Sequence, residues 1–161
     1  MKPRRTLEAR DPAFAERVRD SFGRQPIMHL LGAELTGLDP GRVEIALPFR
    51  HELTQQHGYF HAGVVGTIAD SAGGYAAFSM MPAGSSVLTV EYKLNLVAPA
   101  DGERLRAIGQ VIRSGRTLTV CELEAYVTKD GEELLCAIGT LTAICLIERE
   151  RGLRRDRAET T

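Results

Sequence analysis

The stretch AGVVGTIADSAGGYAAFSM, residues 62–80, decides the fold of this chain. Apolar and small side chains such as Val65, Ile68 and Ala72 recur in it at helical spacing, and Pro82 ends the run. The segment is therefore predicted to be one long helix that is apolar on most of its surface. Such a helix has to be covered by other elements on several sides.

The segments on either side of this helix show the alternation typical of β-strands. Before it, residues 33–38 and 42–49 flank the turn triplet at 39–41, which predicts a β-hairpin. After it, turn sequences separate four further strands, which are expected to form an antiparallel meander. These four strands cover residues 87–97, 103–113, 117–128 and 134–147. The predicted fold class is α+β, an antiparallel sheet of about five or six strands wrapped around the central helix.

The two ends of the chain differ from this central part. Asp11 and Pro12 have the character of an N-cap followed by the first residue of a short amphipathic helix. The last residues, 148–161, are mostly charged and are expected to form a solvated extension. We therefore expect an N-terminal helix and lead-in at 1–27, one domain at 28–147 and this extension, with no second domain.

The overall charge excludes several classes of partner. With 20 Lys and Arg against 21 Asp and Glu, the formal net charge is −1, which gives no basic surface for nucleic acid or anionic lipid. No apolar stretch is long enough for a membrane span, and no signal peptide is expected. Three cysteines, Cys121, Cys136 and Cys145, follow neither a disulfide nor a metal pattern. A cytoplasmic location is the expectation.

The distribution of charge is more informative than its total. Charged residues make up 25% of the chain, yet residues 53–90 contain only one, Asp70. A carboxylate on an apolar helix is costly to keep charged unless it is paired or hydrogen-bonded, and no Lys or Arg lies nearby in the sequence. A lone acid in such a place suits acid–base catalysis. The alternative is a solvent-facing or backbone-bonded Asp.

Small residues share the helical face of this acid. Gly63, Gly66 and Gly73 follow the same spacing as Asp70, so another group must come close to that face. It could be a partner helix, the narrow end of a substrate or the sheet of the same chain.

Two histidines precede the helix at the spacing of a possible metal pair, His57 and His61. Gly58 lies between them and the helix is expected to start near His61, so they do not share one helical face. No cysteine or carboxylate is placed to complete a site, and no metal is predicted. His61 is expected instead to hydrogen-bond locally and shape the helix start.

A family resemblance becomes visible in residues 57–72, HGYFHAGVVGTIADSA. They resemble the H-G-G-x(6)-A-D-x-A signature of the phenylacetate-pathway acyl-CoA thioesterases, within the 4-hydroxybenzoyl-CoA thioesterase superfamily. Residues 90–100, VEYKLNLVAPA, resemble the strand and Pro-Ala turn of that family, and the likeness covers roughly residues 28–147. It implies a hotdog fold and hydrolysis of an acyl-CoA substrate without a bound cofactor.

The resemblance also implies roles for individual residues. Asp70 matches the carboxylate that acts as general base or nucleophile. Ala62, where the family usually has Gly, matches the backbone N–H that polarises the thioester carbonyl. Gln55 matches a side-chain amide that orients water, and Thr89 matches a hydroxyl that supports the acid or the water.

Contacts to the rest of the substrate are expected at two places. His61 and Gly63 lie at the helix start, next to the predicted carbonyl site. Arg113 and Arg116 form a basic turn that could meet the phosphates of coenzyme A, although a solvated hairpin tip has the same composition.

The spacing of the two main catalytic parts predicts a dimer. Eight residues separate Ala62 from Asp70, about 12 Å along a helix axis, too far for both to act on one thioester carbon. We therefore expect a homodimer, and possibly a tetramer, in which each site combines Asp70 of one subunit with Ala62 and Gln55 of the other.

Two other functions are compatible with the same fold. A non-catalytic acyl-CoA binding module would use the same substrate tunnel without cleavage. A hydratase would need an Asp–His pair at matching spacing, which the sequence does not show.

Overall fold

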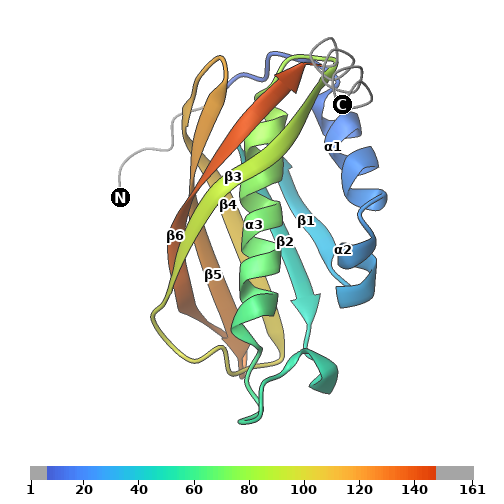
Figure 1. The fold of residues 1–161 in the computed structure, drawn as a ribbon. Coiled ribbons are helices and arrows are strands. Elements are labelled where there is room, and N and C mark those ends of the chain that lie inside the picture. Colours follow the sequence, from blue (N-terminus) through green and yellow to red (C-terminus); the bar gives the residue numbers. More distant parts are fainter. Residues whose placement is uncertain (1–6, 148–161) are drawn as a thin grey trace, which may run out of the picture.

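The computed structural model describes residues 7–147, and these form one curved antiparallel sheet with a long helix, α3, against it (Figure 1). This confirms the predicted hotdog arrangement and the α+β class. The helices are α1 (Phe14–Gly23), α2 (Pro26–Leu31) and α3 (Ala62–Ser79), with a 3₁₀ turn at His51–Leu53. The strands are β1 (Glu34–Asp39), β2 (Arg42–Pro48), β3 (Ser85–Leu96), β4 (Arg104–Ser114), β5 (Leu118–Lys129) and β6 (Glu132–Ile147). The predicted extension at 148–161 lies outside the described residues.

The strand order corrects one prediction. The sheet runs β1-β2-β4-β5-β6-β3 with every neighbour antiparallel. Strands β4, β5 and β6 form the expected meander. Strand β3, predicted to pair with β4 as the first strand of that meander, does not. Instead β3 pairs with β6, and residues 97–103 carry the chain back across the end of the sheet to β4. That crossing spans three strand spacings, about 14 Å. A turn sequence predicts a change of direction but not which strand lies beside the next.

The small residues of α3 and β4 let the helix lie directly on the sheet. A Cβ added at Gly109 of β4 would lie 2.4 Å from the backbone of Ala72 and Gly73. A Cβ added at Gly66 would lie 3.2 Å from the hydroxyl of Tyr92 on β3, and one added at Gly73 would lie 2.6 Å from the side chain of Leu123 on β5. At Gly66 and Gly73 the small-residue stripe therefore serves helix-to-sheet packing, one of the three alternatives that the sequence left open.

The N-terminal helices flank α3 on the side away from β4 to β6 (Figure 1). Helix α1 begins at Phe14, two residues later than predicted, because the Asp11 side chain accepts a hydrogen bond from the Ala13 N–H outside the helix. The short helix α2 was not predicted; it begins at Pro26 and ends at Leu31, where Gly32 caps it with a φ of 67°.

One arginine fixes α1 to the C-terminal end of α3. The guanidinium of Arg17 donates to the carbonyls of Phe78 (3.3 Å), Met81 (2.8 Å) and Pro82 (3.2 Å) and pairs with Asp11 (3.0 Å). Carbonyls at the end of a helix have no partner within it, so a cation there both satisfies and neutralises them. Arg17 thus sets the position of α1 relative to α3.

Strand β3 is an edge of the sheet, with β6 as its one paired neighbour among the described residues. Large apolar side chains on it are exposed: Leu88 (54%), Val90 (57%), Tyr92 (48%) and Leu96 (54%). A long apolar edge strand is a surface on which another chain can pair.

No helix within residues 7–147 is long and apolar enough to cross a membrane.

Candidate active site

Asp70 lies in the middle of α3, on the side that faces β3. Its Oδ1 accepts a hydrogen bond of 2.7 Å from Oγ1 of Thr89 on that strand. The carboxylate is half-buried, and in the described part of the chain no Lys, Arg or His pairs with it. The wrapping expected around α3 is therefore incomplete at this point, because β3 is an edge strand and leaves the acid accessible. The hydroxyl of Thr89 holds one carboxylate oxygen, which leaves the other available for water or substrate.

A cavity of about 540 Å³ opens beside this acid, between α3, β3 and the N-terminal helices. Asp70, Tyr75 and Thr89 line it from the helix and strand, Ser21 lines it from the last turn of α1, and Gln25 lines it from the segment that joins α1 to α2. We call it the Asp70 cavity. No sequence pattern pointed to Ser21 or Gln25, since polar residues at the end of an amphipathic helix are ordinarily solvated.

The first turn of α3 presents an open hydrogen-bond donor. His61 is the N-cap, and its Nδ1 accepts a hydrogen bond of 2.8 Å from the Gly63 N–H, which confirms the local role expected for this histidine. The Ala62 N–H has no acceptor within residues 7–147, and Ala62 is exposed. Because the N-terminus of a helix is also the positive end of its dipole, this N–H suits a developing negative charge on oxygen.

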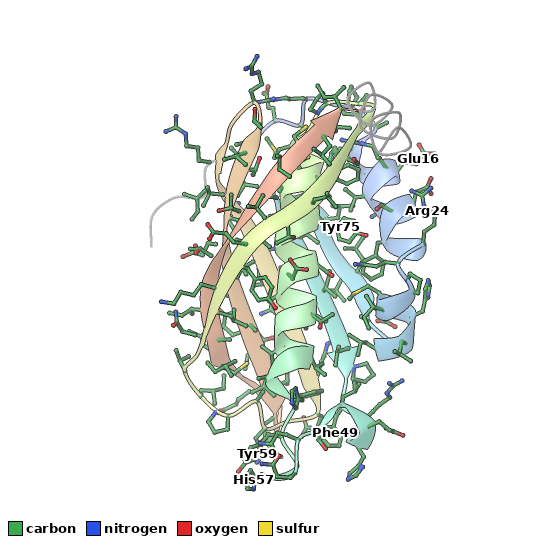
Figure 2. The ribbon with its side chains drawn as sticks, viewed as in Figure 1. Glu16, Arg24, Phe49, His57, Tyr59 and Tyr75 are labelled. Carbon is green, nitrogen blue, oxygen red and sulfur yellow. The ribbon has the colours of Figure 1, made fainter. Side chains whose placement is uncertain are left out.

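A second cavity, of about 420 Å³, lies at this helix start. Gln55, Phe60 and Ala62 line it together with residues 96–100, and we call it the Ala62 cavity. Oε1 of Gln55 accepts a hydrogen bond from the His57 N–H, so the amide nitrogen is the end of that side chain that can donate to a ligand. Figure 2 shows His57 in the loop beyond the start of α3.

The two predicted catalytic parts are therefore kept apart in a single chain. The Asp70 cavity and the Ala62 cavity share no lining residue. Both, however, border the edge strand: Leu88 and Thr89 line the first, and Leu96 lines the second. The structure thus brings Asp70 together with Thr89, and Ala62 together with Gln55, but does not join the pairs.

The predicted coenzyme A contacts lie elsewhere. Arg113 and Arg116 are exposed at the β4–β5 turn and line neither cavity. That turn is at the end of the sheet near the C-terminus of α3. There Gly41 connects the two elements, because its N–H donates to the hydroxyl of Ser79 on α3 and its carbonyl accepts from the Val111 N–H on β4. Gly63 lies at the other end of α3, and its N–H already donates to Nδ1 of His61, so it is not an open donor like the Ala62 N–H.

Two of the three cysteines, Cys121 and Cys136, are not candidates for nucleophilic catalysis. Cys121 and Cys136 are buried in the core, as expected from their strand context. Burial raises the pKa of the Cys121 thiol to about 12 and that of Cys136 to about 11, so both stay protonated at neutral pH. No cluster of three His, Cys, Asp or Glu side chains within metal-binding reach occurs in the part of the chain that the structure describes.

Comparison with known proteins identifies the family. The profile of the thioesterase superfamily matches residues 57–134. A crystal structure of a thioesterase family protein from Silicibacter pomeroyi is 53% identical, with a TM-score of 0.82, over 83% of this chain and 98% of its own. A Saccharolobus solfataricus protein provisionally named an esterase is 32% identical over 114 residues, 71% of this chain and 80% of its own. PaaI of Escherichia coli, from its phenylacetic acid degradation operon, shares the fold with a TM-score of 0.75 at 17% identity, over 83% of this chain and 93% of its own.

The hotdog fold and the match to these relatives identify the class of protein as a thioester hydrolase. The chain belongs to the thioesterase superfamily.

Proposed function

We propose that this protein hydrolyses acyl-CoA thioesters to a free acid and coenzyme A, in sites shared between the two subunits of a homodimer. One observation supports this most directly: the acid with its hydroxyl partner and the open N–H with its amide partner occupy separate cavities, both at the β3 edge. Neither cavity alone contains a complete set of groups for thioester hydrolysis. Two copies of the chain can complete the set if the Asp70 cavity of one copy meets the Ala62 cavity of the other.

In the proposed reaction, water attacks the thioester carbon and its proton passes to the Asp70 carboxylate. The Ala62 N–H of the other subunit hydrogen-bonds the oxygen that becomes negative in the tetrahedral intermediate. Gln55 orients the water, and Thr89 holds the carboxylate. The carbon–sulfur bond then breaks, the thiolate of coenzyme A takes up a proton, and the acid is released. Direct attack by Asp70, through an anhydride, is the variant of this scheme.

The edge strand gives the proposed dimer a specific register. If two copies pair antiparallel through β3 about an axis near Tyr92, then Leu88 of one strand lies opposite Leu96 of the other. The Asp70 cavity of each subunit is then adjacent to the Ala62 cavity of its partner. The pairing also covers the exposed Val90 and Tyr92 and gives the edge strand a hydrogen-bonded neighbour on its open side.

Further contacts are proposed for the substrate and the environment. His61 and Gly63 border the carbonyl end. Arg113 and Arg116 line neither cavity, so their proposed contact with the phosphates of coenzyme A lies outside both. The three free thiols agree with the reducing conditions of the cytoplasm, where we place the protein. Sedimentation analysis will distinguish a dimer from a tetramer made of two dimers.

The first experiment replaces the acid. Asp70→Asn keeps the shape and the hydrogen bond to Thr89 but cannot accept a proton, so kcat for a panel of aryl and aliphatic acyl-CoA substrates should fall by about 10²–10⁴-fold. Asp39→Asn, on the exposed β1–β2 turn, is the matched control and should keep full activity. Unchanged cleavage by Asp70→Asn would refute the assigned chemistry, and binding without cleavage by the wild type would identify a binding module.

The second experiment tests the shared site. Asp70→Asn and Ala62→Pro subunits, each retaining about 1% of wild-type activity or less alone, are mixed and allowed to exchange. Half of the dimers are then mixed, and each mixed dimer has one intact site, so about a quarter of wild-type activity should return. No recovery after proven exchange would show that each subunit works alone. Single-turnover hydrolysis in ¹⁸O water distinguishes the two roles of Asp70, because water attack places the label in the released acid and an anhydride route can place it in the carboxylate.

A further inference from the structure

The far end of the Asp70 cavity carries polar groups that the proposed reaction does not use. Tyr75 follows Asp70 by five residues on α3, about 7.5 Å along the helix axis. Its hydroxyl lies 3.3 Å from Oγ of Ser21 and 3.4 Å from Oε1 of Gln25, and all three residues line the cavity. Figure 2 shows Tyr75 between α3 and α1.

These polar groups are incompletely satisfied. Hydroxyl hydrogen bonds are usually 2.7–2.8 Å long, so both contacts of the Tyr75 hydroxyl are weak, although the residue is only 6% exposed. Burial raises the pKa of Tyr75, so that hydroxyl stays protonated and can donate at neutral pH. A nearly buried hydroxyl with two long bonds gains from a closer partner, and the cavity provides the space for one.

The remaining lining limits the chemistry of that partner. Val87, Leu88 and Pro26 are apolar, and Asp70 at the reacting end would repel a second carboxylate. Arg24, the one cation of this cavity, is exposed at its rim. Hydroxyl and amide groups that can both donate and accept match a neutral hydroxyl better than an anion.

We infer that Tyr75, Ser21 and Gln25 form a polar subsite that hydrogen-bonds a hydroxyl at the far end of the substrate's acyl group. This rests on the proposed acyl-CoA hydrolysis, because the carbonyl carbon has to lie against Asp70. An acyl group running along α3 from that point reaches Tyr75 after roughly six carbon atoms or one six-membered ring. Two of the three subsite residues come from the N-terminal segment, outside the residues 57–134 that match the family profile. The N-terminal helices therefore select the substrate in this chain.

The experiment compares matched pairs of acyl-CoA substrates that differ only in a terminal hydroxyl, one pair aromatic and one a six-carbon chain, with a six-carbon dicarboxylic mono-CoA thioester as a third arm. For the wild type, kcat/KM should be at least about tenfold higher for the hydroxylated member of at least one pair. In Tyr75→Phe and in Ser21→Ala, that ratio should fall toward one. Ser21→Ala also guards against misfolding, because alanine favours the helix that carries it.

Tyr126→Phe is the matched control, since that hydroxyl bonds Glu124 on the other face of the sheet, and its ratio should equal that of the wild type. A wild-type ratio of one or less for both pairs, a ratio that survives both subsite variants, or a preference for the carboxylated substrate would overturn the subsite. Asp70→Asn separates the two proposals. If it abolishes cleavage while the ratio is one, only the subsite is wrong, and if cleavage persists, the proposed function is wrong.

Discussion

The substitution Ala62→Pro removes the proposed oxyanion donor and little else. Ala62 is the first residue of α3, where proline is well tolerated because its fixed φ suits the helix and the N–H has no partner inside it. The preceding His61 has φ −64° and ψ 139°, the extended conformation that a residue before proline prefers. Since the Ala62 N–H has no acceptor in the described chain, the folded state loses no hydrogen bond.

The expected magnitudes differ strongly between stability and activity. Proline at a compatible position restricts the unfolded chain, so the free energy of unfolding should stay the same or rise by about 0.4–1 kcal/mol. Loss of one oxyanion donor costs about 10²–10³-fold in kcat. The lower end, about 100-fold, is expected here, because the Gln55 amide lines the same cavity and can take over part of the role.

The assay combines thermal unfolding with kcat and KM for one good acyl-CoA substrate. Ala62→Gly keeps the N–H and is the matched control; its kcat should stay within about threefold of the wild type, because only the peptide group takes part. If Ala62→Pro folds, dimerises and still turns over within threefold of the wild type, the helix start does not stabilise the transition state and the assignment is wrong.

Three further predictions concern the fold. Gly109→Ala should destabilise the protein by about 3 kcal/mol or more in urea unfolding, since its Cβ meets helix backbone that cannot move aside, and a loss below 1 kcal/mol would contradict that packing. Arg17→Met should cost about 2–4 kcal/mol by unbonding helix-end carbonyls; protease sensitivity confined to α1 checks that this helix is what loosens. Burial raises the pKa of Glu44, but Arg42 and Arg106 outweigh it and hold the pKa below its ordinary value near 4.5. The stability lost in Glu44→Gln should therefore be constant at neutral pH and shrink only as the pH falls below about 4.5; a gap that instead closes between pH 6 and 8 would exclude this cause.

The apolar and polar patterning of the sequence was sufficient for the type of each main element. Helical spacing across residues 62–80 predicted α3 to within one residue of its end, and alternation predicted the six strands. The lone charge at Asp70 and the motif around it indicated the acid and the helix start. These features are local, because a helix face or a strand face repeats every few residues along the chain.

Only the tertiary structure decided which elements lie side by side. The turn-like sequence at residues 97–103 did not predict that β3 pairs with β6 at the edge of the sheet, because strand pairing depends on where the chain emerges from α3. Ser21 and Gln25 carry no motif, and they reach the Asp70 cavity because Arg17 fixes α1 to the end of α3. The sequence by itself determined the elements and the reactive acid, whereas long-range packing decided the open β3 edge, the separation of the two cavities and the walls of the acyl site.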